Sequence, residues 1–143
     1  MIVFGRLSSK QTSALNFFAD ALFSKQMQKY LQIRFSFRKS LKDYQGMVYV
    51  DEFNLQDKLR HFVIVINKKD SEEQQLITMA HELVHVKQFA YGEIDSSLTK
   101  WRGKPVSENM SYVDQPWEIE ADEVSLKLYN LFVESQHGNS NSI

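Results

Sequence analysis

The sequence predicts a single α+β domain, in which a small three-stranded mixed sheet is combined with three helices. Apolar residues at helical spacing lie near both ends of the chain and in its middle. Three short segments rich in β-branched and aromatic residues follow the first helical segment. The chain has 143 residues, a length that suits one domain with its own core. We expect the domain to cover 1–136 and a polar, disordered tail to follow at 137–143.

The first helix is expected from Ser8 to about Tyr30. Ser8 and Gln11 have the spacing of a capping box, in which each side chain bonds to the other residue's backbone N–H. The apolar residues that would pack on the rest of the domain are Leu15, Phe18, Ala19, Leu22 and Phe23.

Three strands are expected at 31–38, 46–53 and 61–67. Phe62–Ile66 is a continuous apolar run, which is typical of a central strand, whereas Met47–Glu52 is mixed in polarity and suits an edge. An edge strand near a catalytic site could bind an extended peptide through backbone hydrogen bonds. The simpler role of this strand is to complete the sheet.

A second helix is expected to begin after Asp70, with Ser71 as its N-cap and Gln74 closing a capping box. Acidic residues in its first turn would interact favourably with the helix dipole. Its apolar positions cover more than one face, so we expect a helix buried on several sides. These positions are Leu76, Ile77, Ala80, Leu83, Val84 and Val86.

This helix contains His81-Glu82-Leu83-Val84-His85, which puts two imidazoles one turn apart on the same face. Two imidazoles and a carboxylate suit Zn²⁺ and leave a coordination position for water. Glu82 could accept a proton from that zinc-bound water during attack on a carbonyl. The competing interpretation is a pair of core histidines hydrogen-bonded to their neighbours.

A second cluster, Pro116 to Asp122, opens the C-terminal helix, with proline in the first turn. Glu118 and Asp122 are four residues apart and share a face. Glu118 could supply the third, anionic ligand, while Asp122 could accept the free imidazole N–H of a ligating histidine. Glu120 points elsewhere but is the alternative third ligand. Both glutamates could instead simply complement the helix dipole.

Together, these two motifs resemble those of small gluzincin-type zinc metallopeptidases. The segment Pro116-Trp117-Glu118-Ile119-Glu120-Ala121 is similar to one in short SprT-like and related zincin-like proteins, many of them encoded by phages and bacteria. The resemblance covers roughly residues 60–135. It implies a zincin-like fold with one zinc ion per chain, in which Glu82 is the catalytic base and Asp122 supports a ligand. The implied ligands are His81, His85 and Glu118.

The connection from Gly92 to Gln115 is long for a compact domain, and such loops are often functional. Tyr112 could donate a hydrogen bond to the developing oxyanion, although packing of the loop is the simpler role. Trp101 and Arg102 could line a substrate cleft, or Trp101 could anchor the loop by burying its ring.

The composition limits the choice of partner and compartment. The formal net charge is −1, so no strongly basic surface indicates a nucleic-acid partner. No apolar stretch is long enough for a membrane span or a signal peptide, and cysteine is absent. We therefore expect a cytoplasmic protein. The metallopeptidase resemblance implies a protein or peptide substrate.

The sequence thus predicts a zinc-dependent peptidase. The alternative is a binding protein of zincin fold whose zinc site is structural or degenerate and which acts on a host protein or a nucleic acid. A retained glutamate between the histidines favours catalysis, because a structural site does not need a base. Hydrolysis of a non-peptide amide would use the same residues.

Overall fold

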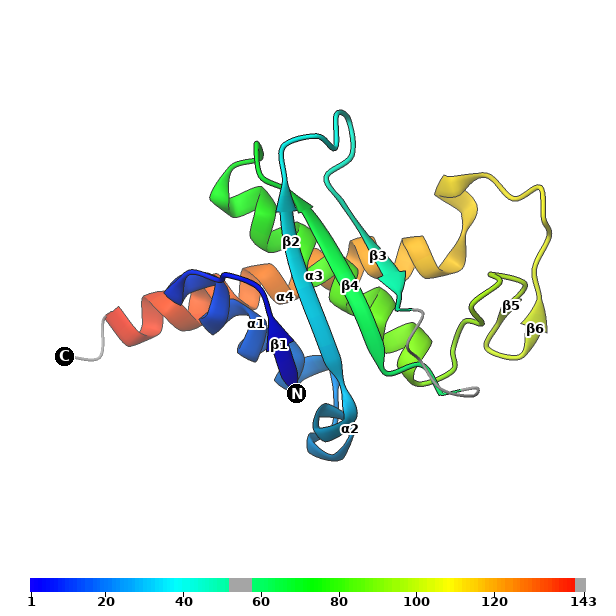
Figure 1. The fold of residues 1–143 in the computed structure, drawn as a ribbon, viewed down its shortest axis with the longest axis horizontal. Coiled ribbons are helices and arrows are strands. Elements are labelled where there is room, and N and C mark those ends of the chain that lie inside the picture. Colours follow the sequence, from blue (N-terminus) through cyan, green and yellow to red (C-terminus); the bar gives the residue numbers. More distant parts are fainter. Residues whose placement is uncertain (52–57, 141–143) are drawn as a thin grey trace.

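The computed structural model describes residues 1–51 and 58–140, which form an α+β domain around one mixed sheet (Figure 1). The sheet has the order β1-β2-β4-β3, from β1 (Ile2–Phe4), β2 (Gln32–Arg38), β4 (His61–Asn67) and β3 (Gly46–Val50). The first three strands in this order are parallel, and β3 pairs with β4 in the antiparallel direction. The predicted fold class is therefore confirmed.

The expected central and edge positions of two strands are confirmed, and one strand was missed. β4 is central and β3 is an edge strand, as the apolar run and the mixed segment predicted. β3 ends at Val50, and residues 52 and 53 of the expected strand lie outside the described residues. The missed strand is β1, which has only three residues, all of them apolar, so its sequence shows no alternation of polar and apolar positions. Its pairing with β2 brings together residues that are far apart in the chain.

One face of the sheet packs on the helices. Along β2, Ile33 and Phe35 are buried while Arg34 between them is exposed, which is the alternation of a strand covered on one side. The helices α1 (Ser9–Leu22), α3 (Glu72–Ala90) and α4 (Pro116–Ser140) lie behind the strands in Figure 1. The core therefore lies between the sheet and these helices.

The expected single helix from Ser8 to Tyr30 is wrong in one respect, because the chain forms two helices. After α1, α2 (Lys25–Tyr30) begins with Ser24 as its N-cap, and the Ser24 hydroxyl accepts a hydrogen bond from the Met27 N–H. A serine at this point satisfies a free N–H and so favours a new helix start. The capping box of Ser8 at the start of α1 is confirmed.

The helix α3 runs through the core and is buried on several sides, as predicted. Its N-cap is Ser71, which accepts a hydrogen bond from the Gln74 N–H. The reciprocal half of the expected capping box is replaced, because the Gln74 side chain donates to the Thr78 hydroxyl instead. The start of the helix was therefore predicted correctly, with one bond differing.

The helix α4 is longer than expected. It continues through Ser140, whereas an irregular tail was expected from His137. Each further residue of an established helix adds a backbone hydrogen bond, and one glycine at 138 costs too little to end it. In the C-terminal half of α4, Phe132 packs edge-on against Phe17 and Phe18 of α1. Among the described residues, no helix is both long and apolar enough to cross a membrane.

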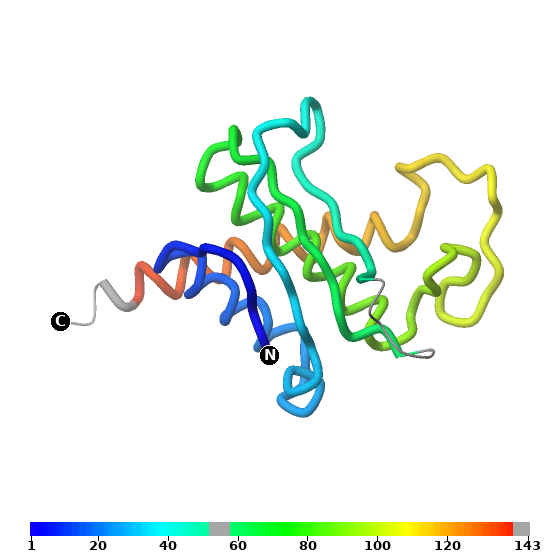
Figure 2. The backbone as a smooth tube through the Cα atoms, in the orientation of Figure 1, coloured from blue at the N-terminus to red at the C-terminus, as the bar shows by residue number. Residues whose placement is uncertain are grey.

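The long connection between α3 and α4 projects away from the sheet, at the opposite end of the molecule from the last turns of α4 (Figure 2). It contains a small hairpin of β5 (Lys100–Trp101) and β6 (Lys104–Pro105), followed by the short helix η1 (Tyr112–Asp114). The hairpin and η1 bring the chain back to the start of α4, beside α3.

Candidate metal centre and catalytic site

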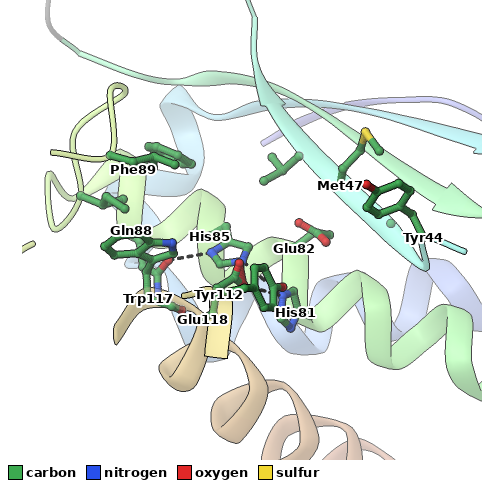
Figure 3. Close-up of a pocket in the computed structure, with 14 residues that line it drawn as sticks. Tyr44, Met47, His81, Glu82, His85, Gln88, Phe89, Tyr112, Trp117 and Glu118 are labelled. Atoms are coloured by element: carbon green, nitrogen blue, oxygen red, sulfur yellow. Dashed lines mark hydrogen bonds and ion pairs between the residues drawn. The ribbon is translucent and has the colours of Figure 1, made fainter. Parts of the chain in front are cut away.

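His81 and His85 project from α3 toward the first turn of α4, where they meet Glu118 (Figure 3). The Nε2 atoms of the two histidines are 3.2 Å apart. The Oε1 atom of Glu118 lies 3.2 Å from Nε2 of His81 and 2.7 Å from Nε2 of His85. Zinc bonds of 2.0–2.2 Å in tetrahedral geometry put ligand atoms roughly 3.3 Å apart. The three side chains could therefore hold one zinc ion with little movement.

The charge of Glu118 is stabilised by its neighbours. Burial alone would raise the pKa of its carboxyl group, but hydrogen bonds from His81 and His85 outweigh that effect and lower the pKa to about 2. Burial alone would lower the pKa of His85, and the hydrogen bond and charge of Glu118 raise it instead. Glu118 is therefore ionised at neutral pH, which is the state that a metal ligand requires.

Glu82 lies in the same cleft but in a different electrostatic situation. It is 6% exposed, and burial raises the pKa of its carboxyl group above the ordinary value, against the effect of the two histidines. Among the residues that the structure describes, no side chain donates a hydrogen bond to this carboxylate. Glu82 is thus a carboxylate with increased proton affinity at the position that the sequence predicted for a base.

Each histidine has a partner for its second ring nitrogen. Nδ1 of His81 lies 3.2 Å from Oδ1 of Asp122, so the predicted contact of Asp122 is present. Nδ1 of His85 lies 2.8 Å from Oε1 of Gln88, a residue that the sequence analysis missed. The available signal was position, because Gln88 is three residues after His85 and so lies on the same face of α3. Such partners orient an imidazole ring toward a metal.

The alternative third ligand, Glu120, lies away from the two histidines. Its Oε1 atom accepts a hydrogen bond of 3.1 Å from Gln88, and its Oε2 atom forms an ion pair with Arg102. The group of side chains able to hold a metal contains Glu118 and not Glu120.

The predicted loop residues fall into two groups. Tyr112 lies over the site beside Glu118 and His81 (Figure 3), and its pKa is raised by partial burial and by the charge of Glu118 and a hydrogen bond with it. Trp101 and Arg102 line neither of the two cavities at the site. The Trp101 ring lies 6.3 Å from that of Trp117, centroid to centroid, so Trp101 anchors the loop to α4.

Two adjoining cavities meet at the site, and both are lined by His81, Glu82 and Tyr112. The cavity on the His85 side has a volume of about 560 Å³, and that on the Asp122 side has about 590 Å³. The apolar side chains of the first cavity are Met47, Val48, Phe89, Ile94, Leu98 and Trp117. The polar side chains that line only the second cavity are Asp43, Gln45, Gln74, Thr78, Asp122 and Ser125.

The comparison with protein families matched most of the chain to a family model. The model of the Peptidase M78 family, described as the IrrE N-terminal-like domain, matches residues 28–124. This range contains the two histidines, Glu82 and Glu118, and it agrees with the metallopeptidase resemblance of the motifs. It gives no support to the closer resemblance to SprT-like proteins or to a phage origin. No curated protein and no solved structure matches the chain significantly.

Proposed function

The chain belongs to the Peptidase M78 family of IrrE N-terminal-like domains, and on that premise we propose that it is a zinc-dependent peptidase acting on a protein or peptide substrate. The observation that supports this most strongly is the position of Glu82. Its buried carboxylate lines both cavities beside a His–His–Glu group that could hold a metal. A purely structural zinc site does not need a base next to it.

In this proposal the metal ligands are His81, His85 and Glu118. Two imidazole nitrogens and one carboxylate oxygen suit zinc and leave a position open. When bound there, zinc would polarise the scissile carbonyl and make water more acidic. Asp122 and Gln88 would hold the two rings in place through their second nitrogens.

Glu82 would move the proton in this reaction. It takes a proton from the attacking water as the new C–O bond forms, and passes it to the leaving nitrogen as the C–N bond breaks. A carboxylate with a raised pKa is a better proton acceptor than an ordinary one at neutral pH. Tyr112, whose raised pKa keeps its hydroxyl protonated, would donate a hydrogen bond to the oxygen of the attacked carbonyl.

The substrate would bind along β3. This strand is at the edge of the sheet, and its residues Gly46, Met47 and Val48 line the cleft (Figure 3). An extended peptide can pair with the backbone of such an edge, which would carry its scissile bond past Glu82. The cytoplasm, expected from the cysteine-free composition, is the proposed compartment.

The first experiment measures zinc per chain in the purified protein and in three variants. About one zinc per wild-type chain is expected, lost in His85→Ala and Glu118→Ala but retained in Glu120→Ala with at most a modest fall in affinity. Loss in Glu120→Ala with retention in Glu118→Ala would reverse the assignment of the third ligand. A wild-type protein that takes up no zinc after reconstitution would refute the proposal.

The second experiment separates catalysis from binding. Zinc-loaded protein is incubated with unfolded protein substrates, and cleavage is followed by mass spectrometry in parallel with Glu82→Gln. Loss of cleavage by at least about a hundredfold in the variant, with zinc still bound, is expected of a general base. Full cleavage by Glu82→Gln would exclude the mechanism. Binding of a partner without cleavage would favour the alternative, a zincin-fold binding protein.

A further inference from the structure

Gln88 is a completely buried polar residue in α3, one turn after His85, and its side-chain amide is fully engaged. The Nε2 atom lies 3.0 Å from the backbone oxygen of Trp117 and 3.1 Å from Oε1 of Glu120. Both of these partners only accept hydrogen bonds, so the Gln88 nitrogen must donate to them. The remaining atom, Oε1, therefore faces Nδ1 of His85 at 2.8 Å.

This orientation determines which nitrogen of His85 carries a proton. An amide oxygen only accepts, so Nδ1 of His85 must donate to it. Without a metal, Nε2 can carry a second proton, which it donates to Glu118. When His85 is neutral, as a metal ligand must be, its one N–H is therefore on Nδ1, and Nε2 is left with a lone pair. That atom is the one that faces His81 and Glu118. The bonds of Gln88 thus set His85 in the tautomer that can ligate a metal.

Glu120 of α4 and Arg102 of the hairpin hold the Gln88 side chain from the side away from His85. Glu120 accepts from Gln88 with one oxygen and pairs with Arg102 through the other. Arg102 also lies over the Trp101 ring, at 4.7 Å from its centroid. The chain of contacts therefore runs from the loop between α3 and α4 through Glu120 to the buried amide.

From these contacts we propose that Gln88 is a positioning residue that fixes the tautomer and orientation of His85 for zinc, and that Glu120 and Arg102 hold Gln88 in place. The inference rests on the metal site of the proposed function, but testing it does not require cleavage. Its prediction is that removing the Gln88 amide weakens zinc binding more than removing other amides of α3.

The test measures zinc affinity by chelator competition for wild type, Gln88→Met and Gln75→Met. Methionine keeps the length of the side chain and removes its hydrogen bonds. Gln75 is the matched control, because its amide also donates two bonds, to the backbone oxygens of Lys68 and Asp70, far from the site. Affinity lower by about ten- to a hundredfold is expected for Gln88→Met, and little change for Gln75→Met.

A direct readout of the tautomer completes the test. In ¹⁵N-histidine spectra of the zinc-loaded wild type, His85 should show a protonated Nδ1 and a metal-bound Nε2. Glu120→Ala, a change at a less buried position, should weaken zinc binding by a smaller factor than Gln88→Met. Equal affinity of Gln88→Met and Gln75→Met, or zinc on Nδ1 of His85, would overturn the inference. Absence of zinc binding by wild type would instead refute the metal site itself.

A different observation, the contrast between the two cavities, leads to a second inference. On the His85 side, six apolar residues form the wall that extends beyond the metal group. On the other side, the lining includes the acidic residues Asp43 and Asp122 beside Ile77 and Leu126, and none of the lining residues that the structure describes is a lysine or arginine. An extended chain through the cleft would pass from an apolar environment into an acidic one within a few residues.

We infer, on the premise of the proposed peptidase activity, that the preferred substrates carry a large apolar side chain on one side of the scissile bond and a lysine or arginine on the other. Burying a large apolar side chain corresponds to a preference of about ten- to a hundredfold over a polar one. A cation beside Asp43 would gain less, because Asp43 is exposed and its charge is screened.

The test uses zinc-loaded Glu82→Gln, which should keep the metal and the cleft but not cleave the peptide. Its binding is measured with fluorescent peptides that differ only at the two positions beside the scissile bond. Tightest binding is expected for the apolar–basic pair, in one of its two orders along the chain. Leu98→Lys, in the exposed wall of the apolar cavity, should reduce the preference for the apolar residue, and Asp43→Asn should reduce the preference for the basic one. Equal binding of apolar–basic and polar–acidic peptides would overturn this inference while leaving the peptidase proposal intact.

Discussion

Replacing Gly46 by alanine should destabilise the protein and disturb the site, because β3 crosses very close to α3 at this residue. A Cβ atom on Gly46 would lie 2.5 Å from Cγ2 of Thr78 and 2.7 Å from the backbone oxygen of Val65. The carboxylate oxygen Oε1 of Glu82 would be 3.7 Å away. Contacts under 3.0 Å cannot be kept, and the Val65 oxygen belongs to the central strand β4.

The magnitude follows from what must move. Thr78 is buried in α3 and cannot swing out to solvent, so either β3 or the helix has to shift. Forcing an extra methyl group into such a contact costs about 1–3 kcal/mol. For a domain of this length, each kcal/mol corresponds to a change of roughly 2–8 °C in Tm. Gly46→Ala should therefore melt several degrees below wild type, and cleavage should fall because β3 moves relative to Glu82.

Thermal melting followed by circular dichroism measures this effect, with Gly138→Ala as the control. Gly138 lies near the end of α4, and a Cβ atom there meets nothing within 4 Å. In a helix, alanine is favoured over glycine by roughly 0.5–1 kcal/mol in free energy, so Gly138→Ala should leave the Tm unchanged or raise it slightly. If Gly46→Ala were as stable as Gly138→Ala, the close approach of β3 to α3 would not be as described.

Three further predictions concern charge, packing and metal. Burial raises the pKa of Glu82, so its ionised form is disfavoured in the folded protein. Without metal, Glu82→Gln should therefore have a higher Tm than wild type at about pH 8, but not at about pH 4, near the unfolded pKa. Thermal melts at the two pH values test this, and a larger difference in Tm at low pH would contradict it. Phe132→Ala should lower the free energy of unfolding in urea by about 3–5 kcal/mol, since Phe132 is 1% exposed and packs against both Phe17 and Phe18. Chelation should lower Tm, because zinc at about a hundredfold above its Kd stabilises by about 2.7 kcal/mol; a Tm independent of free zinc would argue against a native metal site.

Local signals in the sequence were sufficient where short-range chemistry decides the structure. Ser8 and Gln11 form their capping box because both partners are within one turn. The pairing of His81 with His85 follows from helix geometry alone. The apolar run of β4 predicted a central strand because a strand buried on both faces excludes polar residues.

Features set by contacts distant in sequence were not predicted. The three residues of β1 have no pattern of their own and become a strand only by pairing with β2. Gln88 reads as an ordinary polar residue in a helix until α4 brings the Trp117 carbonyl and Glu120 beside it. The break at Ser24 was a local signal that was overlooked, because the apolar spacing continues on both sides of it.

The choice between Glu118 and Glu120 shows where the limit lies. Glu118 and Glu120 are two residues apart in a helix, so their side chains point in directions roughly 200° apart around the axis. Only the rotation of α4 about its axis therefore decides which of the two meets the histidines. That rotation is set by packing, since Trp117 and Ala121 are buried and turn the neighbouring position 118 toward α3. Gln88 then reinforces the same rotation, because it bonds the Trp117 carbonyl and Glu120 simultaneously. The amide that orients His85 thus also helps to place the third ligand, so the geometry of the metal centre and the docking of α4 on α3 depend on the same contacts.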